Sequence, residues 1–285
     1  LLDLFREYSL NYKIQVIFTT HSLSSVEYAL KKKDNVIYLI DNITSVIKMD
    51  SPDIYKIRMY LQNQTQDDIY LSKAIPLFTE DNEARIFLNI LFDYFEEKEV
   101  DFPQVRRFFH CVEANIGSDN LRAIFSDSYL LKSTMKYICI LDGDQRTNLD
   151  HYTITLPGGA SPEKVIMDYA IYLYDNDSAF WTAPTILELN YGKVYFRDNI
   201  KPDIDYIPEK LRELRDAGEK THGVERDLRK KAFLKHQRFF ELLFKQWLND
   251  PENADMINKF YRNLNIMFKK VAEFYGINPR LWNIN

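Results

Sequence analysis

Short apolar runs alternate with longer amphipathic stretches through the middle of the chain. The apolar runs are β-branched or aromatic and are bounded by polar residues, which is typical of buried strands. Between the first two runs, apolar residues recur at helical spacing in NEARIFLNILFDYFEE, so one face of that helix is expected to pack on a sheet. Repetition of strand and helix predicts an α/β fold with a parallel sheet and right-handed crossovers. The predicted strands are 74–80 (AIPLFTE), 105–115 (VRRFFHCVEAN), 134–142 (TMKYICILD) and 153–157 (TITLP).

Further helices are predicted after the second strand and after the fourth. In GSDNLRAIF, Ser118 or Asp119 is a candidate N-cap. The helix KVIMDYAIYLY has Pro162 well placed for its first turn. From about residue 207 the chain becomes charged and helical, and the apolar face of its last segment, INKFYRNLNIMFKKVAEFYGI, is expected to pack on the protein.

The first 71 residues have a different pattern. An amphipathic helix is predicted at LLDLFREYSL, followed by a strand at 14–20 (IQVIFTT) that is apolar enough to be buried on both faces. A loop and short helix then lead to a second strand in NVIYLIDN. Two strands flanking a short connection suggest the closing edge of an α/β domain, and we expect the chain to be a fragment of a longer protein.

Composition fits a globular protein without a membrane span. The 285 residues are 46% hydrophobic and 28% charged, with a formal net charge of −5, and no apolar run approaches the roughly 20 residues that a spanning helix needs. Cys111 and Cys139 lack metal-binding spacing and are expected to be buried, reduced thiols, which suits a cytoplasmic protein.

Acidic side chains follow two of the predicted strands. Glu80 ends the first, and Asp142 and Asp144 end the third in LDGDQ. Ligands bind beyond the carboxyl ends of the strands in such sheets, so the three carboxylates would meet if these strands are neighbours. Strand periodicity would place Asp142 and Asp144 on the same side, and such hard oxygen ligands suit Mg²⁺ or Mn²⁺. The alternatives are a solvated Asp-Gly turn at Asp142 and helix N-terminal acids at Glu80 and Asp81.

The order of these segments resembles a known family. The Glu in LFTEDNEA, the GSDN turn and the DGD segment resemble the Toprim domain of topoisomerases, primases and nucleases. Upstream, QVIFTTHS resembles the last strand and switch histidine of ABC-type ATPases. An ATPase tail followed by a Toprim unit is similar to OLD-family ATP-dependent endonucleases, including those of Gabija and some retron anti-phage systems. The implied domains are an ATPase part and connector (1–71), a Toprim nuclease (72–206) and a helical region (207–285).

The resemblance implies roles for residues that match the family pattern. Glu80 and Asp142 would be metal ligands, with Asp144 a ligand or a neighbour of one. In LPGGASPEK, Glu163 would serve a second metal, although a plain helix start explains this segment equally well. His21 would approach the γ-phosphate of ATP in the whole protein. Toprim sequences usually have Gly after the first Glu, whereas Asp81 stands here.

A lysine beyond the acidic segments is also implied. The run RDLRKKAFLKHQRFF offers Lys230, Lys231 and Lys235, and Lys235 is favoured because it precedes an aromatic pair. The same helix also carries Arg226. Its basic residues would either contact the phosphates of a nucleic acid or form a solvated helix face.

The expected function is therefore a Mg²⁺-dependent or Mn²⁺-dependent DNA endonuclease coupled to an ABC-type ATPase in anti-phage defence. ATP would be bound by the full-length protein, which would pair through its ATPase domain. The alternative is a catalytically silent Toprim-like assembly module that docks a partner, such as a reverse transcriptase with its nucleic acid. A third hypothesis is a receiver or phosphatase site in which Asp142 accepts a phosphoryl group.

Overall fold

A computed structural model of the chain describes residues 1–42, 44–61, 73–132, 136–176, 178–221 and 223–283. The chain divides into two compact units. One comprises Leu1–Lys73 and Gly276–Asn278, and the other comprises Ala74–Tyr275 and Pro279–Asn285. The predicted helical region from residue 207 thus belongs largely to the same unit as the sheet.

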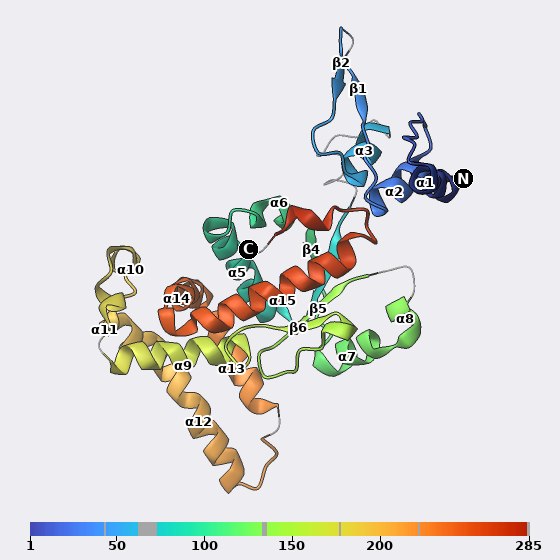
Figure 1. The fold of residues 1–285 in the computed structure, drawn as a ribbon. Coiled ribbons are helices and arrows are strands. Elements are labelled where there is room, and N and C mark those ends of the chain that lie inside the picture. Colours follow the sequence, from blue (N-terminus) through green and yellow to red (C-terminus); the bar gives the residue numbers. More distant parts are fainter. Residues whose placement is uncertain (43, 62–72, 133–135, 177, 222, 284–285) are drawn as a thin grey trace. The chain divides into compact units, whose positions relative to one another are not determined.

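The larger unit is built on a four-stranded parallel sheet (Figure 1). Its strand order is β4-β3-β5-β6, and every pairing is parallel. The predicted α/β class with a parallel sheet is confirmed. The strands are β3 (Ile75–Thr79), β4 (Phe109–Cys111), β5 (Ile138–Leu141) and β6 (Thr153–Thr155).

Helices cover both faces of this sheet, as alternate strand residues require. Phe78 of β3 is paired in register with Cys139 of β5. These two residues pack with Leu121 and Phe125 of α7 (Ser118–Ser126). On the other face, the ring of Phe109 lies 5.6 Å from Phe92 of α5 (Asn82–Lys98) and 5.9 Å from Phe268 of α15 (Ala254–Ala272).

The second half of this unit is helical, and its longer helices pack on α5 and on one another. The helix α9 (Pro162–Asp175) begins with Pro162, as the sequence predicts. It is followed by α12 (Lys201–Asp216), α13 (Val224–Lys235) and α14 (Gln237–Asn249). The shorter elements are α6 (Phe102–Arg106), α8 (Ser128–Lys132), α10 (Pro184–Glu188), α11 (Lys193–Tyr195), a π turn η3 (Phe196–Ile200), and the 3₁₀ turns η1 (Leu149–His151), η2 (Ala179–Thr182), η4 (Pro251–Asn253) and η5 (Pro279–Leu281).

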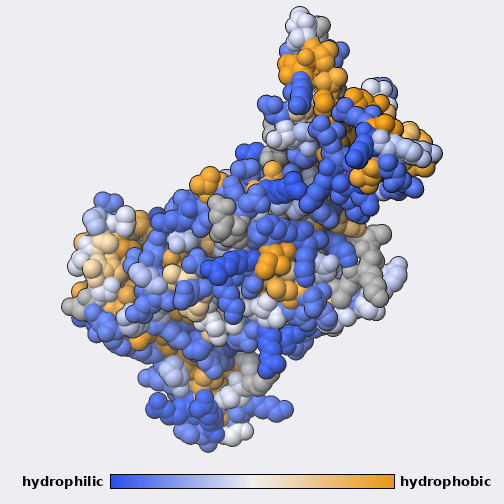
Figure 2. Space-filling model, in the orientation of Figure 1, coloured by the Kyte–Doolittle hydropathy of each residue, from blue (hydrophilic) through white to orange (hydrophobic). Residues whose placement is uncertain are grey.

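The smaller unit consists of three helices and a hairpin in its described residues. The predicted N-terminal helix is α1 (Leu2–Tyr12), and α2 (Leu23–Lys31) begins at Ser22, whose hydroxyl accepts a hydrogen bond from Ser25 N. The strands β1 (Leu39–Asp41) and β2 (Val46–Lys48) form an antiparallel hairpin, and α3 (Ile54–Leu61) follows. Figure 2 shows apolar side chains on this hairpin, where Leu39, Val46 and Ile47 are exposed.

The predicted strand at 14–20 is wrong. Residues 13–22 form no strand, and Ile14, Ile17 and Phe18 are exposed. A strand buried on both faces needs neighbouring strands for its backbone hydrogen bonds, and the described part of this unit offers only the β1–β2 hairpin. Of the second predicted strand, only Leu39–Asp41 forms, and it pairs antiparallel.

Two details of the larger unit also differ from expectation. The predicted strand at 105–115 is reduced to Phe109–Cys111, and Val105 and Arg106 belong instead to the helix α6, which Pro103 helps to start. Neither Ser118 nor Asp119 caps α7. Gly117 is the N-cap, with a φ of 76° that favours glycine, and its N–H donates to Glu80 O at 3.2 Å.

Within the described ranges, no helix is both long enough and apolar enough to cross a lipid bilayer. Cys139 is buried and Cys111 is partly buried, and both are free thiols. Burial raises the pKa of Cys139 to about 12, so its thiol is protonated at neutral pH.

The core contact between α5 and α14 gives the first prediction. Phe87 is fully buried, and its ring stacks 4.3 Å from that of Phe244. Phe87→Ala should lower the free energy of unfolding by about 3–5 kcal/mol, because it leaves a cavity between two helices. Urea denaturation measures this loss. Phe274→Ala, at a site that is 48% exposed, should cost less than about 1 kcal/mol, and equal losses for the two variants would contradict this account of the core.

Candidate functional site: a buried carboxylate cluster

Glu80 and Asp142 meet at the carboxyl ends of two neighbouring strands. β3 and β5 are paired, which is the adjacency that the sequence analysis required. The backbone N–H of Asp142 donates to Glu80 Oε1 at 3.0 Å. The residues are only 2% and 3% exposed, so two carboxyl groups are buried side by side.

Glu163 lies near enough to Asp142 for its charge to help raise the pKa of Asp142, because two loops approach closely. The N–H of Gly143 donates to Ala160 O at 3.1 Å, which holds the segment 157–161 against the turn after β5. A Cβ atom on Gly143 would lie 2.7 Å from Gly159 N, so only glycine permits this approach. The helix α9 starts directly after this contact, and Glu163 in its first turn is 1% exposed.

The turn at Asp142 and Gly143, which was the alternative to a carboxylate cluster, forms together with that cluster. Because β5 ends at Leu141, strand alternation does not extend to Asp144. Gln145 N instead donates to Asp142 O at 3.1 Å, which closes a turn. Asp142 is therefore buried while Asp144 is exposed and accepts a hydrogen bond from Gln145 Nε2. The expected strand alternation through Asp144 is therefore wrong, although the charge of Asp144 still helps to raise the pKa of Glu80.

Burial and mutual repulsion change the acidity of these groups. Burial, with the charges of Glu80, Asp81 and Glu163, raises the pKa of Asp142 to about 9. The pKa values of Glu80 and Glu163 are also raised, in both cases chiefly by burial. Carboxylates in this setting are stabilised by protonation or by a nearby cation.

Some of these oxygen atoms have no partner. In the described residues, the buried side-chain atoms that lack a hydrogen-bond partner are Asp142 Oδ1 and both carboxylate oxygens of Glu163. Buried polar atoms without a partner are uncommon and costly. Their position in one acidic cluster favours a positively charged ligand there.

Two cationic side chains of α13 lie at the edge of the cluster. Arg226 Nη2 is 2.9 Å from Asp81 Oδ2 and 3.5 Å from Glu80 Oε2. Lys230 Nζ, one helical turn later, is 2.5 Å from Asp81 Oδ2 and 3.6 Å from Glu83 Oε2. Burial alone would raise the pKa of Asp81, but the hydrogen bonds from Lys230, from Ala84 N and from Arg226 hold it below its ordinary value.

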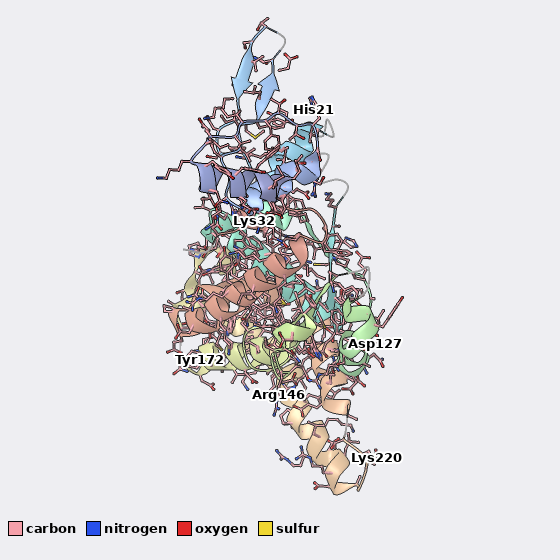
Figure 3. The ribbon with its side chains drawn as sticks, turned by 45° about the vertical axis from the view of Figure 1, so that its right-hand side comes forward. His21, Lys32, Asp127, Arg146, Tyr172 and Lys220 are labelled. Atoms are coloured by element: carbon pink, nitrogen blue, oxygen red, sulfur yellow. The ribbon has the colours of Figure 1, made fainter. Side chains whose placement is uncertain are left out.

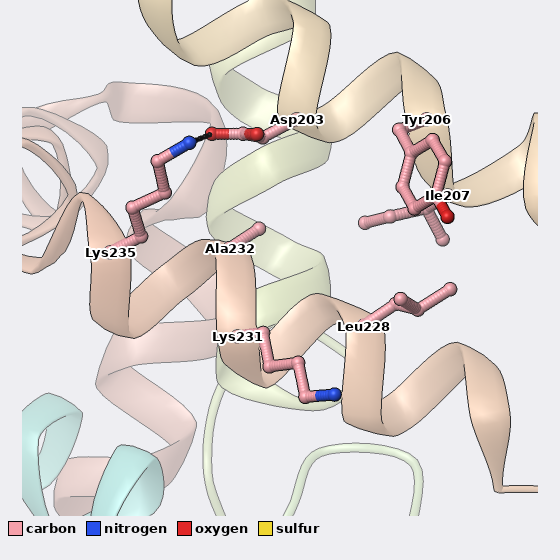
Figure 4. A pocket seen from close by; sticks show the side chains of 7 residues that line it. All are labelled: Asp203, Tyr206, Ile207, Leu228, Lys231, Ala232 and Lys235. Atoms are coloured by element: carbon pink, nitrogen blue, oxygen red, sulfur yellow. Dashed lines mark ion pairs between the residues drawn. The ribbon is translucent and has the colours of Figure 1, made fainter.

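Lys235, the lysine that the sequence favoured, lies elsewhere on the same helix. Its Nζ is 2.7 Å from Asp203 Oδ2 of α12 (Figure 4). The same oxygen lies 2.6 Å from His236 Nε2. Lys231 and Lys235 line a groove between α12 and α13. The structure therefore brings Lys230 to the carboxylates and pairs Lys235 with Asp203.

His21, the predicted γ-phosphate contact, belongs to the smaller unit. It lies in the loop that precedes α2, where its side chain is exposed (Figure 3). The hydroxyl of Thr20, beside it, accepts a hydrogen bond from Ser22 N at 3.0 Å. The loop thus leads directly into the capped start of α2.

The chemistry of the cluster suits a hard divalent cation, but its present geometry is not that of a formed metal site. Glu80, Asp142 and Glu163 supply oxygen ligands, which Mg²⁺ and Mn²⁺ prefer. In the described parts of the chain, no group of three or more His, Cys, Asp or Glu side chains is arranged to hold one metal ion as it stands. Metal binding would therefore require side chains at the cluster to move.

The ion pairs between Asp81 and α13 were not predicted from the sequence. From the sequence, Asp81 was a candidate helix N-terminal acid and a departure from a glycine, and Arg226 was part of a basic helix. The four-residue spacing of Arg226 and Lys230 does place them on one helix face. The face that meets the sheet is set by packing, and these contacts join residues 145 and 149 positions apart.

Comparison with known proteins adds no relative. No family model, curated protein sequence or solved structure matches this chain. The cluster is thus interpreted from its own residues.

The raised pKa of Asp142 makes stability depend on pH. Its carboxyl group keeps its proton in the folded state up to about pH 9, whereas its ordinary pKa is 3.8. The stabilisation from this proton is complete below the ordinary pKa and is lost as the pH rises toward 9. Asp142→Asn mimics the protonated form, so without metal its stability advantage over the wild type should grow by more than about 1 kcal/mol between pH 5 and pH 8.

Urea denaturation in EDTA at the two pH values measures this difference. Asp168→Asn on α9, whose side chain is 58% exposed, is the control and should differ from the wild type by a constant amount. An Asp142→Asn advantage that does not change with pH would show that Asp142 ionises normally.

The close approach at Gly143 gives a second prediction for the site. Gly143→Ala should cost about 1–3 kcal/mol of unfolding free energy, because the new methyl group would push the backbone at Gly159 and Ala160 away. Gly192→Ala is the matched control, since its Cβ would meet only the flexible side chain of Leu187 at 3.3 Å. Denaturation curves that are the same for both variants would contradict the tight contact.

Proposed function

We propose that this chain is a divalent-metal-dependent phosphodiesterase that cuts DNA, with a Toprim-like nuclease domain. The observation that supports it best is the buried meeting of Glu80, Asp142 and Glu163 with three carboxylate oxygens left without partners. A four-stranded parallel sheet places the first two of them at the carboxyl ends of adjacent strands. Such an edge is where ligands bind in α/β sheets.

Each residue of the cluster has a distinct task in this proposal. Glu80, Asp142 and Glu163 would hold Mg²⁺ or Mn²⁺, and the exposed Asp144 would add an oxygen at the solvent side. Bound cations would supply Lewis-acid stabilisation of the charge that develops in phosphodiester hydrolysis. Lys230 is better placed than Lys235 to offset charge on a phosphate, because it already lies against Asp81 and Glu83.

The proposed context is an OLD-like protein of anti-phage defence in which an ABC-type ATPase controls cleavage. The support for this is the resemblance of QVIFTTHS to the switch segment of such ATPases, with His21 at its end. The 285 residues contain no GxxxxGK[ST] loop. ATP binding would therefore need further residues of the whole protein. Pairing of subunits through the ATPase part, and docking of a reverse transcriptase complex, belong to the same proposal.

A catalytically silent assembly module is the second candidate. It is favoured by the ion pairs of Arg226 and Lys230, which already neutralise part of the acidic cluster, and by the lack of a formed metal site in the described residues. In such a module the carboxylates would hold α13 in place.

Nicking of supercoiled plasmid by the full chain with Mg²⁺ or Mn²⁺ separates the two candidates. For a nuclease, Asp142→Asn and Glu163→Gln should each lower the nicking rate at least about 100-fold, since each removes a charged ligand. Asp168→Asn, an exposed acid on the same helix as Glu163, should leave the rate unchanged. A folded protein that binds no Mn²⁺ and cuts no DNA, with or without ATP, would favour the assembly module.

A further inference from the structure

Asp81 is a buried acid whose partners are cationic side chains and a helix end. It is 6% exposed and is the N-cap of α5, where Oδ1 accepts a hydrogen bond from Ala84 N at 3.0 Å. This bond fixes the carboxylate and leaves Oδ2 for α13. Arg226 and Lys230 both donate to Oδ2.

Arg226 contacts the carboxylates of both Asp81 and Glu80. It is 2.9 Å from Asp81 and 3.5 Å from Glu80, so the shorter contact is to Asp81. Its side chain is 44% exposed, which leaves room for the guanidinium to move on the solvent side. Lys230, by contrast, pairs with Asp81 and Glu83.

A cation bound to Glu80 would lie close to the positive charge of Arg226. Like charges a few ångströms apart repel, and burial weakens the screening by water. Either the cation binds poorly or the guanidinium withdraws from Glu80. Withdrawal costs little if the contact with Asp81 is kept, because a charge-assisted hydrogen bond is then retained.

We propose that Arg226 is a displaceable counter-ion of Glu80, and that Asp81 retains Arg226 when a divalent cation binds. In the metal-free protein, Arg226 neutralises Glu80 and stabilises the acidic edge of the sheet. When a cation occupies Glu80, Arg226 pairs with Asp81 alone. Asp81 is thus a positioning residue for Arg226, and this assignment depends on the proposed metal binding.

The first test is the affinity of the full chain for Mn²⁺, measured by electron paramagnetic resonance of the free ion. Arg226→Gln should bind Mn²⁺ about tenfold more tightly than the wild type, which corresponds to about 1.4 kcal/mol. Lys230→Gln removes the same charge nearby without touching Glu80 and should change the affinity much less. Arg229→Gln, whose partner is Glu225 on the same helix, should not change it.

The second test asks whether Asp81 acts through Arg226. Asparagine caps helices as well as aspartate does, so Asp81→Asn should keep α5 intact. It should weaken Mn²⁺ binding in the wild type, because Arg226 then pairs with Glu80 alone. In the Arg226→Gln background most of this loss should disappear, since interacting residues give non-additive effects.

Thermal unfolding is a readout that needs no activity. Without metal, Arg226→Gln should melt at a lower temperature than the wild type, because Glu80 and Asp81 lose a counter-ion. With saturating Mn²⁺ it should recover more than the wild type gains. Arg226→Lys, which keeps the charge, should stay closer to the wild type in both conditions.

The outcomes distinguish this assignment from the proposed function. Absence of Mn²⁺ binding by the wild type and by Arg226→Gln would overturn both. Wild-type binding that is lost in Asp142→Asn but unchanged in Arg226→Gln would overturn only the counter-ion role. Equal gains in Arg226→Gln and Lys230→Gln would show a general charge effect, and an equal Asp81→Asn loss in both backgrounds would make Asp81 a direct ligand.

Discussion

The pairing of β3 with β5 forces Glu80 and Asp142 together at one edge of the sheet. Two carboxyl groups that are nearly inaccessible to water cannot both ionise cheaply unless positive charge is near. Three features of the cluster are related to this cost of burying charge. Asp142 keeps its proton, Arg226 approaches Glu80, and the oxygens of Glu163 remain without partners.

Much of the surrounding architecture maintains this arrangement. Gly143 lets the segment before α9 pass close to the turn after β5, which brings Glu163 to the cluster. Packing of α5 beneath α14 fixes the helix that Asp81 caps. Because α13 contacts both α9 and α12, its cationic face is held toward the acidic edge. The buried carboxyl groups at this edge are destabilising, whereas the buried aromatic contacts of the core stabilise the unit.

The metal-dependent and the silent hypotheses differ in what completes the charge balance. Side-chain cations alone are enough for a stable module, and Arg226 and Lys230 supply part of that balance. They do not reach the unpartnered oxygens of Asp142 and Glu163, as these have no hydrogen-bond partner. A mobile cation would satisfy those oxygens, which is why we favour metal chemistry at this site.

The sequence by itself determined the α/β class, the parallel strands around Glu80 and Asp142, and the helix that begins at Pro162, because apolar periodicity and proline act locally. The strand predicted at 14–20 does not form, since a strand exists only where another strand pairs with it. Tertiary structure alone decided that Asp142 is buried and Asp144 exposed, because a turn replaces strand alternation there. It also decided that Lys230 and not Lys235 meets the carboxylates, since helix rotation is set by packing between residues far apart in the chain.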